Sequence, residues 1–456
     1  MTAGWSGAER GMLVYRVLQW LLRVATRVFF RRVEVVGRDN VPRTGPVLFC
    51  GNHPNSLLDP ILITAHGGRV VQFAAKDTLF DSPVLGFFLR RMGAVPVRRR
   101  MDHPDGALDN DAAFAALHEV LAEGRAIGIF PEGISHLDSQ LAPLKTGAAR
   151  IALGAVRRPP GQVVHMVPTG LVYTTRHRFR SSVLIQFGAP IAVDAGTVER
   201  AGGDDKAAAR WLTDQIEARL RALTVNADSW DTAWVLDGVR RLYQPEGLSL
   251  EQRIELARRF NTVYPQVAHH EDVRALFGRV RTYLTRLSAD GIGDEVVRRG
   301  VGLRDTAARV IGHLALLLFW APLALIGAPL HVPLGLLFRY AGRSIAPRKD
   351  AVATAKFVLG FLTLLAVYGG LAALAGWRFG LGAAGLTLLV LPLSGWALVH
   401  VIGRLDALRH LALTLARVVR LGRELDVLRA ERAALVEEVT AAVDRHRPAD
   451  MDPMFG

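Results

Sequence analysis

Three long apolar stretches in the C-terminal part of the chain place the strongest constraint on its fold. They span residues 312–338, 357–376 and 381–402. A helix needs about 20 mostly apolar residues to cross the hydrocarbon core of a bilayer, where backbone groups must pair with one another. We therefore expect a membrane region over residues 304–403, in which the second and third stretches form a two-helix hairpin.

The distribution of Lys and Arg predicts the orientation of this hairpin. Only Arg378 lies in the short connection between its two helices, whereas basic residues gather on both outer sides. They are Arg339, Arg343, Arg348, Lys349 and Lys356 before the pair, and Arg404, Arg409 and Arg417 after it. Because loops rich in Lys and Arg stay in the cytoplasm, we expect both ends of the hairpin there.

The first stretch, 312–338, contains Pro322, Pro329 and Pro333. If it crossed the membrane completely, the basic N-terminal part of the chain and the basic loop after it would lie on opposite sides. Proline breaks or kinks a helix, so we expect a broken, re-entrant or interfacial helix pair. This arrangement leaves the N-terminal domain on the cytoplasmic face of the cell membrane.

The charge balance indicates which partners the chain attracts. Lys and Arg number 56 against 42 Asp and Glu, and half of the 456 residues are hydrophobic. A net charge of +14 on so apolar a chain favours anionic membrane lipid over nucleic acid as the partner. The single cysteine, Cys50, excludes an internal disulfide and suits a reducing compartment. Arginines interrupt the apolar stretch near the N-terminus, so we expect no secretory signal.

Residues 12–30 predict an amphipathic helix within an N-terminal segment, 1–34. Leucine, valine and aromatic residues fill most of its circumference, and three arginines lie along the rest. These are Arg16, Arg23 and Arg27. Such a helix suits the headgroup region of a membrane, with Trp20, Phe29 and Phe30 as anchors. An ordinary helix packed on the core is the alternative.

Residues 35–200 predict an α/β domain in which a mixed sheet is flanked by helices. Short runs rich in β-forming residues alternate there with helical stretches. The runs are VEVV, PVLFC, VVQFAA, AIGIF, VVHMVPTGLVY and VLIQF. In such domains, functional side chains gather in the turns at strand ends.

One of these turns carries a histidine and an aspartate. Asn52 and His53 follow the PVLFC run, and Asp59 lies six positions after the histidine. On one continuous helix, His53 and Asp59 would lie roughly 240° apart. Pro54 disfavours helix at His53 and suits a helix start, so a strand, a turn and a new helix can bring them together. An aspartate that fixes one ring nitrogen leaves the other to accept a proton. The alternative is a turn histidine that caps a helix.

Two further turns carry charged side chains. Residues 93–100 end in three arginines that suit phosphate oxygens, although in so basic a chain such a run, taken alone, is more often a solvated surface. Phe130 ends the next run, and the turn after it presents Glu132, Gly133, Ser135 and His136. Taken alone, this second turn reads as a loop with a stray carboxylate.

Taken together and in order, these blocks resemble the glycerolipid acyltransferase family, which acylates glycerol 3-phosphate and 1-acylglycerol 3-phosphate. The resemblance covers residues 35–195. The family's blocks are an Asn-His with a downstream Asp, Gly-x-x-x-x-Arg, Phe-Pro-Glu-Gly and a Val-Pro strand. They correspond here to Asn52-His53 with Asp59, residues 93–98, residues 130–133, and residues 167–170.

Two departures bear on the acceptor. Five residues lie between His53 and Asp59, where the family usually has four, and Phe-Pro-Glu-Gly continues Ile-Ser-His in place of Thr-Arg-Ser. Both variants resemble the branch that acylates glycerol 3-phosphate or dihydroxyacetone phosphate. Acylation of 1-acylglycerol 3-phosphate at sn-2, or of another lysophospholipid, stays open. So does a non-catalytic lipid-binding membrane protein, although the presence of His53, Asp59 and Glu132 disfavours it.

The resemblance implies a role for each candidate residue. His53 and Asp59 would be catalytic, with acyl-CoA or acyl-carrier protein as the thioester donor and a glycerol phosphate as the acceptor. Substrate would be held by Arg98, Arg99, Glu132, Gly133, Ser135 and Lys145. We expect no metal site and no cofactor beyond the donor, and Cys50 suits packing better than nucleophilic attack.

The remaining segments read as helical. Residues 201–303 show apolar residues at three- and four-residue spacing and predict a helical domain covering the catalytic one. Residues 404–456 form a charged tail, in which we expect one long helix over 404–447. Its leucines recur loosely at heptad spacing, so the helix either packs on the protein or pairs with a second copy in a homodimer; a plain amphipathic surface helix is the third possibility.

Overall fold

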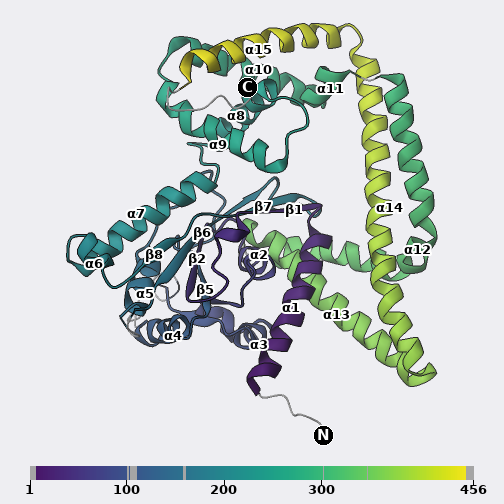
Figure 1. The fold of residues 1–456 in the computed structure, drawn as a ribbon. Helices are drawn as coiled ribbons and strands as arrows, with labels where there is room; N and C mark the ends of the chain where they lie inside the picture. Colours follow the sequence, from purple (N-terminus) through teal and green to yellow (C-terminus); the bar gives the residue numbers. More distant parts are fainter. Residues whose placement is uncertain are drawn as a thin grey trace. The chain divides into compact units, whose positions relative to one another are not determined.

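The computed structural model describes residues 7–99, 102, 110–157, 161–300, 302–346 and 348–447. The chain divides into two compact units. The first comprises Met1–Asn226 together with Pro347–Thr354, and the second comprises Ala227–Ala346 with Ala355–Gly456. Figure 1 shows the sheet in the first unit and the long helices in the second.

An eight-stranded mixed sheet organises the first unit and confirms the predicted fold class. Its strands are β1 Arg32–Val36, β2 Val47–Gly51, β3 Val71–Lys76, β4 Val95–Val97, β5 Ala126–Ile129, β6 Val164–Tyr173, β7 Ser182–Phe187 and β8 Ile191–Val193. The order is β1-β7-β6-β2-β5-β3-β4, and β8 pairs with β6. Strand β6 runs antiparallel to β7 and β8, and the other pairs are parallel. Strand β2 is buried along its whole length, as its unbroken apolar run requires.

Helices cover both faces of this sheet (Figure 1). They are α1 Gly7–Phe29, α2 Leu58–His66, α3 Pro83–Arg91, α4 Asp111–Ala122, α5 Gly147–Ala155, α6 Thr197–Arg200 and α7 Asp205–Leu223, with short 3-10 turns at Arg38–Asn40, Asp77–Asp81 and Lys349–Ala351. Leu48 packs in one core with α4, α5 and α7. Successive side chains of a strand point to opposite faces, so Phe49 points to the face covered by α2. Helix α2, the next helix after β2, therefore packs back on the strand that precedes it.

Helix α1 packs on the sheet of the first unit, and two of the three predicted membrane anchors are wrong. Phe29 and Phe30 are buried, with only 6% and 0% of their surface exposed, whereas Trp20 is 59% exposed. Arg23 donates from Nε to the carbonyl oxygen of Ala65 at 2.9 Å, so it faces α2. The anchoring pattern was misread because the helix buries one apolar side in the domain and exposes another.

The boundary predicted for the helical domain also differs from the structure. Helices α6 and α7 belong with the sheet, and the division falls after Asn226. The second unit contains α8 Trp230–Tyr243, α9 Leu250–Val267, α10 Glu271–Asp290, α11 Asp294–Arg299, α12 Leu303–Ser344, α14 Leu381–Leu421, α15 Glu424–His446 and most of α13 Val352–Phe379. Side chains of α8, α10, α11 and α15 share one core.

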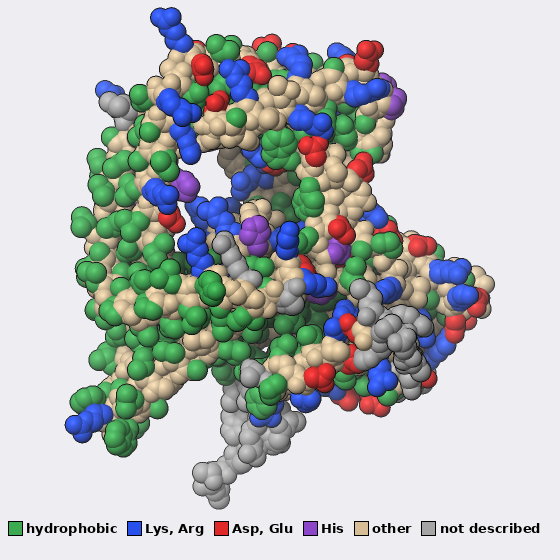
Figure 2. Space-filling view, turned by 180° about the vertical axis from the view of Figure 1, so that it is seen from behind, with side chains coloured by type: hydrophobic (Ala, Val, Ile, Leu, Met, Phe, Trp, Pro, Cys, Tyr) green, Lys and Arg blue, Asp and Glu red, His purple; other side chains and the backbone are tan. Residues whose placement is uncertain are grey.

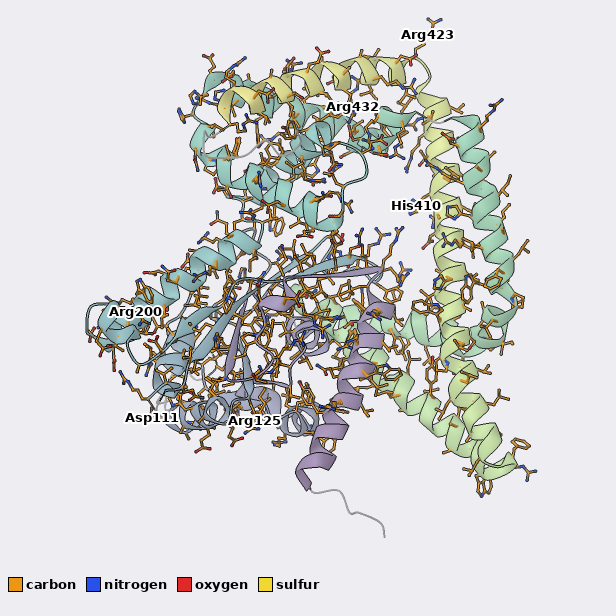
Figure 3. The ribbon with its side chains drawn as sticks, in the orientation of Figure 1. Asp111, Arg125, Arg200, His410, Arg423 and Arg432 are labelled. Atoms are coloured by element: carbon orange, nitrogen blue, oxygen red, sulfur yellow. The ribbon has the colours of Figure 1, made fainter. Side chains whose placement is uncertain are left out.

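The tail is not the single helix that we expected. Helix α14 continues to Leu421, and the chain turns at Gly422, whose φ of +48° suits glycine. Helix α15 then packs within the chain, with Leu428 and Leu435 almost completely buried. Arg432, labelled in Figure 3, binds Asp294 of α11 with two hydrogen bonds of 2.9 and 3.2 Å. Leu425, Leu428 and Leu435 of the predicted stripe are therefore buried inside this unit.

Among the described residues, three helices are long and apolar enough to cross a membrane: Arg304–Gly342, Lys349–Phe379 and Leu381–Leu421. Figure 2 shows hydrophobic side chains over much of their outer surface. The predicted break in the first is wrong, since α12 is assigned as one helix with all three prolines inside it. Figure 1 shows instead that α12 changes direction along its length, the kink that internal proline produces without ending a helix.

Candidate active site

The strand, turn and helix expected around His53 are present, and they bring His53 and Asp59 together. Strand β2 ends at Gly51 and α2 begins at Leu58. His53 Nδ1 lies 2.8 Å from Asp59 Oδ2. The Asp59 side chain is completely buried, while 18% of the His53 side chain is exposed. The imidazole is therefore held on its Nδ1 side and can act through Nε2.

Two further hydrogen bonds orient the carboxylate of Asp59. The Asn55 backbone N–H donates to Oδ2 at 2.7 Å, and the Tyr173 hydroxyl donates to Oδ1 at 2.6 Å. Burial raises the pKa of Tyr173 well above its ordinary value, and the nearby Asp59 charge raises it further, so the phenol stays a donor. Ser56 adopts a left-handed φ of 50°, which turns the chain back toward the carboxylate. The five-residue spacing is thus accommodated by a tight, fully bonded turn.

Glu132 and Ser135 brace this turn from the neighbouring loop. Glu132 Oε1 accepts from the backbone N–H of His53 at 2.7 Å, and Oε2 accepts from Ala142 N at 2.9 Å and pairs with His136. Ser135 Oγ accepts from Ser56 N at 3.0 Å. Glu132 is only 2% exposed. In this structure, both residues predicted to touch substrate hold the turn between His53 and Asp59 in place.

Basic side chains gather at the Gly133 turn. Arg99 donates from Nη1 to the Gly133 carbonyl oxygen at 3.0 Å and from Nε to Asp102 at 2.8 Å. Gly133 has a φ of +71°, and a Cβ there would lie 2.6 Å from Lys145 Nζ, so Lys145 covers the turn closely. The Arg98 side chain is 56% exposed, and its Nε lies 3.9 Å from Asp77 Oδ2. Two of the predicted phosphate ligands, Arg99 and Lys145, thus flank the Gly133 turn, whereas Arg98 lies beside Asp77. Arg100 lies outside the described residues.

A small pocket beside His53 adds residues that the sequence reasoning missed. Its lining includes His53, Glu132, His136, Arg176 and Asn226. Arg176 donates to the carbonyl oxygens of His136 and Asp138 at 3.4 and 3.3 Å. Arg176 follows the end of β6, and β6 pairs with β2. The rule that functional residues lie at strand ends could therefore have singled it out.

Two family models match the chain, one in its N-terminal part and one in its C-terminal part. Residues 12–172 match the model described as Acyltransferase, and residues 235–451 match the model described as Glycerol-3-phosphate acyltransferase 2 C-terminal domain. Together with the sheet and the pairing of His53 with Asp59, these matches identify residues 12–172 as an acyltransferase domain of the glycerolipid acyltransferase type.

Two similar proteins are glycerol-3-phosphate O-acyltransferases of yeast. The chain is 26% identical to glycerol-3-phosphate O-acyltransferase 2 of Saccharomyces cerevisiae over 72% of this chain and 58% of that protein. It is 24% identical to glycerol-3-phosphate O-acyltransferase 1 of the same yeast, over 62% and 49% respectively. It thus spans about half the length of these relatives.

Two further similarities concern the acyltransferase domain. Lyso-ornithine lipid O-acyltransferase of Rhizobium meliloti is 32% identical over 34% of this chain and 50% of that protein. Among solved structures, the 1-acyl-sn-glycerophosphate acyltransferase PlsC of Thermotoga maritima matches with a TM-score of 0.36 and 18% identity, covering 48% of this chain and 83% of that one.

Proposed function

We propose that this protein is a membrane-bound O-acyltransferase of phospholipid synthesis. It moves a fatty acyl group from acyl-CoA or acyl-carrier protein to a hydroxyl of a glycerol phosphate, with glycerol 3-phosphate as the favoured acceptor. The observation that carries this proposal is the 2.8 Å contact between His53 Nδ1 and Asp59 Oδ2 at the end of β2. It supplies a general base with its orienting carboxylate.

The residues support a direct transfer from the donor to the acceptor. Nε2 of His53 takes the hydroxyl proton as the acceptor oxygen attacks the thioester carbonyl carbon. The tetrahedral intermediate then expels the thiolate, which receives that proton from the imidazolium. The buried carboxylate of Asp59 stabilises the imidazolium in between. The acyl group passes directly from sulfur to oxygen, so no acyl-enzyme forms.

The basic residues near Gly133 support a phosphate-bearing acceptor. Arg98 and Lys145 would pair with its phosphate oxygens, while Arg99 holds the Gly133 carbonyl. The match of residues 235–451 to a glycerol-3-phosphate acyltransferase C-terminal domain supports glycerol 3-phosphate. The five-residue spacing between His53 and Asp59 supports the same choice.

Acylation of a lysophospholipid is the second candidate. Relatives named 1-acyl-sn-glycerol-3-phosphate acyltransferase are 30–32% identical over about a third of this chain or less.

The three apolar helices and the net charge of +14 support a place at an anionic membrane, with the catalytic unit on the cytoplasmic face.

An acyl-transfer assay on the full chain in lipid nanodiscs tests the proposal. Acyl-CoA and acyl-carrier protein are each paired with glycerol 3-phosphate and with 1-acylglycerol 3-phosphate, and the products are separated. We expect turnover with glycerol 3-phosphate to exceed that with the lysolipid. His53→Ala should lower turnover on the order of 100-fold or more, while His269→Ala, at an exposed loop histidine in the other unit, should not. Equal turnover of His53→Ala and the wild type would remove His53 as the general base, and no turnover of the wild type with any pair would favour a non-catalytic lipid-binding protein.

A further inference from the structure

Helix α2, which carries Asp59 in its first turn, lacks a side-chain cap of its own. Its N-cap residue is Leu57, which has no polar side chain, and no cap hydrogen bond is formed by it. Helix starts expose backbone N–H groups that a Ser, Thr, Asp or Asn side chain usually satisfies. Leu58 is completely buried, so water cannot serve its N–H readily.

The capping oxygen comes from Thr354, at the start of α13. Thr354 Oγ1 accepts from the Leu58 N–H at 3.2 Å, a donor that it shares with the Asn55 carbonyl oxygen at 3.1 Å. The same hydroxyl donates to that carbonyl oxygen at 3.0 Å. Thr354 is 6% exposed and Asn55 1% exposed. One hydroxyl therefore closes the start of the helix and the end of the catalytic turn.

Asn55 links this cap to the catalytic pair. Its backbone N–H donates to Asp59 Oδ2, the oxygen that also contacts His53 Nδ1. Its side chain donates to the Arg176 carbonyl oxygen at 2.9 Å, and its own carbonyl oxygen accepts from Thr354. Any shift of Asn55 therefore moves a donor that fixes the Asp59 carboxylate.

We infer that Thr354 is a positioning residue for the acyl transfer proposed above, on which this inference rests. Thr354 lies in the segment Pro347–Thr354, which belongs to the catalytic unit. The same helix, α13, continues to Phe379 as a candidate membrane span. The catalytic turn is thus completed by the first turn of that helix, 296 positions after Leu58.

Thr354→Val keeps the size and branching of the side chain but removes both hydrogen bonds. In the full chain in nanodiscs, we expect kcat to fall about three- to tenfold, the effect of roughly one hydrogen bond, with both substrate KM values within about twofold. Thr354→Ser keeps the hydroxyl and should restore kcat to within about twofold of the wild type. Thr363→Val makes the same change nine positions further along α13 and should leave kcat unchanged.

Two measurements distinguish a failure of this inference from a failure of the proposed function and from unfolding of the variant. Carbethoxylation of His53 by diethyl pyrocarbonate, followed by peptide mass spectrometry, should slow severalfold in Thr354→Val and not in Thr354→Ser. This readout decides the inference even if the wild type transfers no acyl group, a result that would remove the proposed function alone. Thermal unfolding shows whether each variant is folded; if the valine variant is not, Thr354→Ala replaces it.

Wild-type kcat and His53 reactivity in Thr354→Val would overturn the inference. Equal losses in Thr354→Val and Thr354→Ser would also overturn it, because packing rather than the hydroxyl would then be responsible.

Discussion

The phenyl ring of Phe130 lies flat against the imidazole of His53, with the ring centroids 4.0 Å apart and the planes inclined by 8°. Phe130 follows the end of β5 and His53 follows the end of β2, and these strands are paired. The stacking therefore limits rotation of the imidazole while its Nδ1 is held by Asp59.

Loss of this stacking should slow the reaction without weakening substrate binding. Phe130→Leu should lower kcat about three- to tenfold, the range expected for one aromatic pair, with little change in either KM. Phe130→Tyr should stay near the wild type. Steady-state kinetics with matched folded fractions measure both, and Phe88→Leu on α3 serves as the control. A rise in KM alone would contradict a role in holding the ring.

The charge of Asp59 should matter more than any one of its hydrogen bonds. Asp59→Asn keeps the shape but loses the charge that stabilises the imidazolium, so we expect kcat to fall on the order of 100-fold or more. Tyr173→Phe removes only the 2.6 Å bond to Oδ1 and should cost about three- to tenfold. Comparable losses in the two variants would mean that the phenol has a larger part than orientation.

The two neighbouring arginines should separate kinetically. Arg98 is the more exposed, so Arg98→Gln should chiefly raise KM for the phosphate-bearing acceptor, by about tenfold or more. Arg99 holds the Gly133 carbonyl, so Arg99→Gln should lower kcat and the unfolding temperature together. Kinetics with varied acceptor, alongside thermal unfolding, distinguish the patterns. An acceptor KM unchanged in Arg98→Gln would remove that residue from the phosphate site.

His136 should make stability depend on pH. Its hydrogen bond with Glu132 raises its pKa above the ordinary 6.5, although burial opposes this. A raised pKa means that the folded state favours the protonated ring. The stabilisation is complete below pH 6.5 and disappears as the pH rises through the folded-state pKa. The difference in unfolding temperature between the wild type and His136→Gln should therefore shrink from pH 5.5 to 8.5. A difference that grows with pH would reverse the assigned sign.

The orientation of the membrane helices can be tested at the end of α12. Helix α12 has 42 residues, about 63 Å of helix and roughly twice the thickness of the hydrocarbon core. This length lets it lie partly along the membrane with both ends in the cytoplasm. A fluorescent protein fused after Ser344 should therefore fold and fluoresce, and a reporter active only outside the cytoplasm should stay silent. Activity of the second reporter would place this loop outside.

Much of the catalytic unit could be read from local patterns. The six apolar runs correspond to six strands, because a buried strand needs consecutive apolar residues. Strands β4 and β8 were missed because three residues carry too little pattern. The turn at His53 was predicted correctly because proline restricts the residue before it. Whether His53 and Asp59 are catalytic stays a prediction.

The partners of the turn could not be read in this way. Ser135, Tyr173 and Thr354 reach it from 79 to 296 positions away, and such pairings depend on the folded sheet. Likewise, Phe29 and Phe30 look like membrane anchors until the domain that covers them is known. Three prolines suggest a broken helix, yet kinking kept α12 in one piece.

The bond between Thr354 and the turn has a consequence for biosynthesis. A ribosome makes residues 52–59 early and reaches Thr354 only after the whole first candidate span, 304–342, has been synthesised. A nascent chain therefore contains His53, Asn55 and Tyr173, the hydrogen-bond partners of Asp59, before Thr354 is available to cap the start of α2. The hydrogen bonds of Thr354 can therefore form only after that candidate span has been synthesised.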